Sequence, residues 1–188
     1  MIKYLEEFGK YIAIAGFRDV EIADVEALLE KTRKNVGKNI EVQFFDAGFA
    51  ATWQHLYFAA LNALTAFKNR ENISKSLAIE TLLYASAQRQ IRKAMKLLGI
   101  KQNSREIAVL IIGENAGEVD SALHVVSRIL GGKRDDEVLE LSQEKNEKMR
   151  NAFEISDVEL EAVTREGAMN KALTDLVIER MALLAAEH

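Results

Sequence analysis

A run of six apolar residues, Ile107 to Ile112, constrains the fold of this chain more than any other feature of its sequence. The run is continuous rather than alternating and is rich in β-branched residues, which is typical of a central strand. Such a strand needs other elements to cover it. The chain has 188 residues, enough for one domain that buries about 70% of the surface of its unfolded chain.

Further strands and helices are expected around this strand. Tyr11–Ala15, which Gly16 ends, and the alternating segment Ile40–Phe44 favour strands, and Val138–Leu141 is a short strand candidate. Helices are predicted after Asp24, over Ala51–Phe67, over Ser74–Leu98 with a break near Ala85–Ser86 and a stop at Gly99, over Gly117–Ile129, from Ser142 to Phe153, and from Ser156 to Ala186 with an interruption at Gly167. The sequence predicts a single compact α/β (α+β) domain over residues 1–188, with a small central mixed sheet flanked by several helices.

The composition excludes several classes of protein. The chain has no cysteine, so disulfides, thiolate metal sites and cysteine nucleophiles are excluded, and a reducing, cytoplasmic location is expected. No apolar run approaches the roughly 20 residues of a membrane span. The N-terminus is acidic and lacks the apolar segment of a signal peptide.

We find no pattern typical of a catalytic, metal or cofactor site. None of the histidines, His55, His124 and His188, has another histidine at helical spacing, and no cluster of Asp or Glu joins them. His55 lies in the most apolar helix, where a hydrogen-bonded core histidine is expected. No nucleophile elbow, phosphate loop or dinucleotide motif is present. We therefore predict a protein that is not an enzyme and that binds no metal or cofactor.

Charge is distributed unevenly along the chain. Residues 68–105 contain nine Lys or Arg against two acids, and residues 135–166 contain eleven acids against four bases. This asymmetry indicates two surfaces with different partners, or an ordinary fluctuation in solvated faces. The net charge of -4 alone argues weakly against nucleic acid.

One helix gives the charge asymmetry a geometry. Between Ala87 and Leu98, four cations, Arg89, Arg92, Lys93 and Lys96, recur with helical spacing. Ile91, Ala94, Met95 and Leu98 recur in the same way on the opposite side, so one face is expected to be buried and the other basic. Solvated helices usually mix acids among such cations. The stripe therefore favours an anionic, phosphate-bearing partner over a chance pattern.

The same segment carries a resemblance to a known family. Tyr84–Ile91, with Ala94 and Leu98–Lys101 after it, resembles the signature of the CGI-type kinase-binding subunits of the KEOPS complex, the PRPK-binding protein family. Weaker similarities follow in the expected order: Asp46–Ala47, His55–Leu56, Ala59–Ala63, Gly131–Gly132, Asp136, Val138–Glu140 and Val177–Leu183. The chain departs from the family at Ser86–Ala87, where some archaeal members have a Ser-Gly pair, and in longer segments over residues 1–10 and 159–169.

The resemblance implies a single non-catalytic domain, monomeric alone, that binds the N-lobe of a small kinase-like ATPase. It also implies membership of the complex that makes threonylcarbamoyl-adenosine in tRNA, and a role in recruiting tRNA by its single-stranded 3′ end. The residues expected to bind RNA are Arg89, Arg92, Lys93, Lys96, Gln88, Lys75 and Lys101. Those expected to bind the kinase are Val177, Ile178, Met181 and Leu184 of the last helix, unless all four belong to the core.

Two alternatives remain open at this stage. One is a small-molecule enzyme that uses an unrecognised pocket around Trp53 and His55. The other is an unrelated regulatory α/β domain that dimerises. A deep polar pocket would favour the first, and the mass in solution would test the second.

Overall fold

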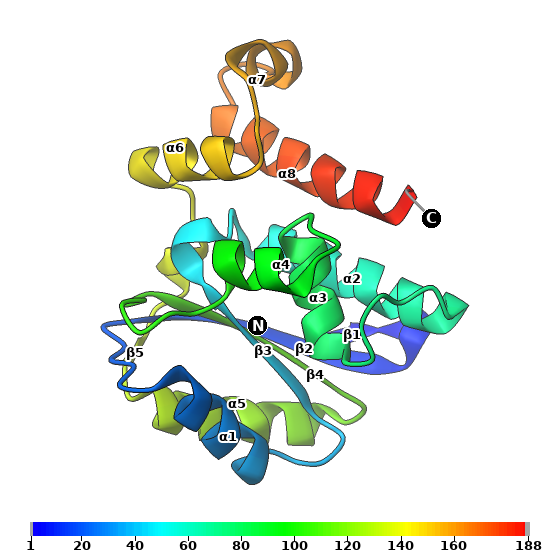
Figure 1. Cartoon of the computed structure of the whole chain (residues 1–188), viewed down its shortest axis with the longest axis vertical. Coiled ribbons are helices and arrows are strands. Elements are labelled where there is room, and N and C mark those ends of the chain that lie inside the picture. The colour runs from blue at the N-terminus through cyan, green and yellow to red at the C-terminus, as the bar shows by residue number, and fades with distance from the viewer. Residues whose placement is uncertain (1, 187–188) are drawn as a thin grey trace. The chain divides into compact units, whose positions relative to one another are not determined.

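The computed structural model describes residues 2–186, which group into two compact units (Figure 1). We call them the sheet unit, residues 2–46 and 100–138, and the helical unit, residues 47–99 and 139–186. His188 lies outside the described residues. The predicted α+β class is confirmed, and the prediction of one domain over residues 1–188 stays a prediction.

The sheet unit is built on a five-stranded sheet in which the described pairings are antiparallel. Its strands are β1 (Ile2–Leu5), β2 (Lys10–Arg18), β3 (Glu41–Asp46), β4 (Ile107–Gly113) and β5 (Lys133–Arg134). The order is β1-β2-β4-β3, and β5 pairs with the end of β2. β4 is buried along its whole length, as its apolar run predicts. The sheet is thus antiparallel rather than mixed.

Two helices, α1 (Val25–Asn35) and α5 (Ala116–Leu130), pack on one face of this sheet (Figure 1). The core between them includes Phe17, Phe44 and Val109 from the strands, with Val126 from α5. Asp24 caps α1 as predicted, because its carboxylate accepts a hydrogen bond from the Ala27 N–H at 2.9 Å.

Two local predictions about strands are wrong. Gly16 does not end its strand but lies inside β2, where a Cβ atom would stand 2.5 Å from the Asp135 carbonyl oxygen. Glycine is therefore required there by close backbone approach. Residues expected to form a strand at Val138–Leu141 instead contribute to a 3₁₀ turn, Asp136–Leu139. Asp135 accepts a hydrogen bond from the Glu137 N–H, and such side-chain bonds favour turns over strands.

The helical unit holds the remaining helices. They are α2 (Trp53–Asn69), α3 (Leu77–Ala85), α4 (Ile91–Leu98), α6 (Gln143–Ala152), α7 (Asp157–Val163) and α8 (Met169–Ala186). α2 packs against α3 and α8, and α7 and α6 pack against α8 (Figure 1). The predicted capping box at Ser156 and Glu159 is confirmed, as are the breaks near Ala85–Ser86 and Gly167. No helix among the described residues is long and apolar enough to cross a membrane.

Candidate functional site

The basic helix α4 is preceded by a tight turn that ends α3. The Ala87 N–H donates to the Tyr84 carbonyl at 2.9 Å, and the Gln88 N–H donates to the Leu83 carbonyl at 3.0 Å. Ala87 is left-handed, with φ of 49°. These bonds define a Schellman motif, whose left-handed position is usually glycine. The predicted helix over Ala87–Leu98 therefore begins only at Ile91, and residues 87–90 form the turn.

The four predicted cations of the stripe are exposed. Arg89 lies in the turn, and Arg92, Lys93 and Lys96 lie on α4. Arg92, Lys93 and Lys96 form no ion pair with any residue in the range 2–186. α4 contains no acidic residue, and Gln90, the residue before its first turn, forms no capping hydrogen bond through its side chain. The positive end of the helix dipole thus adds to the cationic surface.

The opposite face of α4 is only partly buried. Ala94 and Leu98 are buried as predicted, and Met95 is half-buried. Ile91 was expected on the buried face but is 46% exposed. The reason is that the helix is shorter than predicted: Ile91 is its first residue, so no preceding helical turn covers its side chain. The stripe therefore has an apolar side chain at its N-terminal edge.

The remaining predicted RNA-binding residues lie in different places. Gln88 is half-buried in the turn, and Lys75 is exposed in the loop before α3. Lys101 is half-buried and belongs to the sheet unit.

A buried glutamate that the sequence analysis did not single out shapes the loop that carries Lys75. Glu80 is fully buried, and its carboxylate accepts hydrogen bonds from the Ile73 and Ser74 N–H groups, at 3.1 and 2.6 Å. Burial and the charge of Glu80 raise the pKa of Tyr84, one helical turn further on, against the opposing effect of Arg89. No sequence pattern around Glu80 indicated that this residue is buried and binds the loop backbone.

His55 is the hydrogen-bonded core histidine that the sequence predicts. Its ring is fully buried in α2. Nδ1 accepts the Ala51 N–H at 3.0 Å, and Nε2 lies 2.7 Å from the Ala85 carbonyl oxygen. Burial, with a smaller contribution from the charge of Lys145, lowers its pKa to about 4. Both nitrogens are occupied, so His55 does not offer the alternative enzyme a base or a metal ligand.

The apolar row expected to bind the kinase is mostly core. Val177, Met181 and Leu184 are buried in α8, and Ile178 is half-buried. The sequence left open whether all four belong to the core; three of them do, and their binding of a kinase stays a prediction. The exposed residues of α8 include other apolar side chains, among them Leu183, which is 51% exposed. Helical spacing alone did not separate the two flanks, because apolar residues occur on both.

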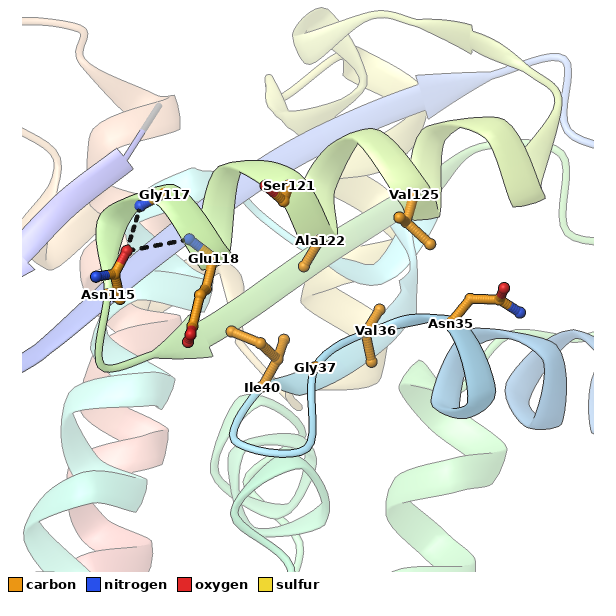
Figure 2. Close-up of a pocket in the computed structure, with 10 residues that line it drawn as sticks. All are labelled: Asn35, Val36, Gly37, Ile40, Asn115, Gly117, Glu118, Ser121, Ala122 and Val125. Carbon is orange, nitrogen blue, oxygen red and sulfur yellow. Dashed lines mark hydrogen bonds between the residues drawn. The ribbon is translucent and has the colours of Figure 1, made fainter.

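An open pocket of about 530 Å³ lies in the sheet unit between the end of α1 and the start of α5 (Figure 2). Asn115 stands at its rim, and its side-chain oxygen already accepts the N–H groups of Gly117 and Glu118. Glu118 is the one charged residue among the ten that line it. This lining offers no nucleophile paired with a base. Among residues 2–186, no group of three or more His, Cys, Asp or Glu could hold a metal ion.

Two comparisons with known proteins point to the same family. A family described as "Kinase binding protein CGI-121" matches residues 17–185. A curated protein from Methanocaldococcus jannaschii, "Regulatory protein Cgi121", is 32% identical over 116 residues. The matched segment covers 62% of this chain and 72% of that relative.

Proposed function

The chain belongs to the kinase-binding CGI-121 family, and from that premise we propose that it is a non-catalytic regulatory subunit with two partners. One partner is the small kinase-like ATPase subunit of the KEOPS complex. The other is tRNA, which the subunit holds for threonylcarbamoyl-adenosine modification. We also propose that it is cytoplasmic and monomeric when alone.

The observation that carries the RNA part of this proposal is the row of exposed cations on α4, Arg92, Lys93 and Lys96, which form no ion pair with any residue in the range 2–186. Three exposed cations on one short helix repel one another, and no acid on that helix offsets the repulsion. A polyanion that meets the stripe removes this repulsion and releases its own counterions. The uncapped N-terminus of α4 adds a partial positive charge on the same side.

The arrangement around the stripe suits a single strand better than a duplex. Arg89 can grip a phosphate with two N–H groups or stack on an unpaired base. Exposed Ile91 stands at the edge of the stripe and can contact a splayed base, which a duplex does not present. The lysines act as charges for the phosphates and carry no base preference. We therefore propose the unpaired 3′ end of tRNA as the segment bound here.

The salt dependence of tRNA binding tests the proposal. If about four phosphates of a single strand are neutralised, log K should fall with log salt with a slope near -3, at roughly -0.7 per contact. The double reversal Arg92→Glu with Lys96→Glu should reduce the slope to about half and weaken binding by more than tenfold. Both residues are exposed, so the unfolding curve should not change. Removing the unpaired 3′ end should mimic Arg89→Ala.

A matched control is available on another helix. Arg33 and Lys31 are exposed on α1, and their double reversal to Glu changes the net charge by the same amount. This control should leave the slope and the affinity for tRNA near those of the original chain. Binding that is independent of salt, or equal losses in both double variants, would show that α4 is only a solvated face.

A further inference from the structure

The break between α3 and α4 has no local cause in the sequence. Residues 86–90, Ser-Ala-Gln-Arg-Gln, contain neither glycine nor proline, and Ala, Gln and Arg are strong helix formers. The turn also holds Ala87 in the left-handed region, which is unfavourable for any residue with a side chain. Local preference therefore favours one continuous helix from α3 into α4. Tertiary contacts therefore maintain the break, and the burial of Ala94 and Leu98 on α4 is one of them.

His55 makes another such contact, and its tautomer is fixed by its neighbours. The Ala51 N–H is a donor, so Nδ1 must carry the lone pair that accepts it. The ring is neutral, so its proton is on Nε2, which donates to the Ala85 carbonyl at 2.7 Å. In a continuous helix the same carbonyl would accept the N–H of Arg89, four residues on. The histidine donor stands where the Arg89 N–H would otherwise bond.

We propose that His55 is a positioning residue that holds α3 and α4 apart and so sets the place of Arg89 at the edge of the basic stripe. Without the Nε2 donor, Ala85 would accept from Arg89, the turn would become helical, and Arg89 would rotate away from its present position. The part concerning RNA rests on the proposed function. The part concerning the turn does not.

Two amide substitutions separate the two hydrogen bonds of His55. The side-chain amide of Gln reaches about as far as Nε2, so His55→Gln keeps a donor for Ala85 and loses the acceptor for Ala51. The shorter His55→Asn keeps an acceptor near the position of Nδ1 and loses the donor for Ala85. Each variant loses one of the two hydrogen bonds of His55, so both should lose stability. A purely structural role for His55 predicts that they behave alike.

The conformation of the turn is the first readout. The ¹³Cα chemical shift of Ala87 and the amide exchange of Ala87 and Gln88, measured by NMR on the full chain, report whether the turn is left-handed or helical. In His55→Asn the Ala87 shift should move to its helical value, whereas His55→Gln should keep the present one. Equal shifts in both variants would overturn the proposal, whatever happens to RNA binding.

The affinity for tRNA is the second readout. His55→Asn should bind about tenfold more weakly, the size expected for loss of the charge-assisted contact of Arg89, and His55→Gln should stay within about twofold. If the turn changes in His55→Asn but tRNA affinity does not, while the Arg92 and Lys96 reversal still weakens it, His55 does not position the RNA surface. If the reversal also has no effect, the proposed function fails, and the Ala87 shift alone decides whether His55 holds the turn.

Discussion

Lowering the pH from 7.5 to 5 should destabilise this protein by about 2 kcal/mol through His55 alone. The ring is fully buried and its pKa is lowered from 6.5 to about 4, mainly by burial. The unfolded chain therefore binds a proton as the pH falls below about 6.5, while the folded chain stays neutral at this site until about 4. Stability contributed by the neutral ring is complete above pH 6.5 and is lost as the pH falls toward 4.

The magnitude follows from the two pKa values. A difference of about 2.5 units corresponds to about 3.4 kcal/mol in full, at 1.36 kcal/mol per unit. At pH 5 the unfolded form is almost fully protonated and the folded form is about one-tenth protonated, which leaves a loss of about 2 kcal/mol. The nearby charge of Lys145 also opposes protonation of the ring, whereas the hydrogen bond from the ring to the Ala85 carbonyl favours protonation.

Urea unfolding at four pH values between 7.5 and 5 measures this loss. His55→Gln has no titrating ring, so its free energy of unfolding should vary much less over the same range. Carboxylates whose pKa is lowered, such as Glu159 at about 2 and Asp136, affect stability chiefly below pH 5 and do so in both proteins. Parallel stability curves for the original chain and His55→Gln would refute the assignment of a neutral, buried His55.

Two further predictions concern the turn and α8. Ala87→Gly should stabilise the protein by about 0.5–1 kcal/mol in urea unfolding, because relief of the left-handed strain outweighs the entropy of glycine in the unfolded chain. The control Ala78→Gly, within α3, should destabilise the protein by about 1 kcal/mol. A lower stability of Ala87→Gly would contradict the claim that Ala87 is strained. On α8, Leu183→Glu should weaken calorimetric binding to the purified kinase subunit at least tenfold and leave folding intact, since Leu183 is exposed. Met181→Glu should instead unfold the chain by placing a charge in the core, and normal binding by Leu183→Glu would exclude this flank of α8 as the docking surface.

Sequence patterns predicted most elements because each depends on local signals. The apolar run of β4, the Asp24 cap and the Ser156 capping box all act within a few residues. The exceptions depend on distant contacts. Gly16 looked like a strand end, yet its lack of a side chain serves the approach of Asp135, more than a hundred residues away. β1 was not predicted, since its four residues are too few for a pattern.

In the candidate site, too, features with local causes could be predicted and features that depend on distant contacts could not. The exposure of Arg92, Lys93 and Lys96 could be predicted, because charge and helical period are local properties. The start of α4 could not, since His55 lies thirty residues before the carbonyl that it binds. The buried row of α8 was ambiguous for another reason: Val177 and Met181 are apolar on one flank, and Ala182 and Leu183 on the other. Only packing decides which flank is core.

The two charged segments of the sequence differ in how their charges are used, and this difference favours the basic one as the binding surface. At least five acids between residues 135 and 166 have cationic partners within the chain: Asp135 with Arg18, Asp136 with Arg134, Glu144 with Lys148, Asp157 with Arg150, and Glu159 with Arg180. The three cations of α4 have none among the described residues. Internal pairs neutralise much of the acidic field, whereas the α4 field extends into solvent within about one Debye length, roughly 8 Å at physiological salt. An incoming polyanion is therefore attracted to α4 even though the net charge of the chain is negative.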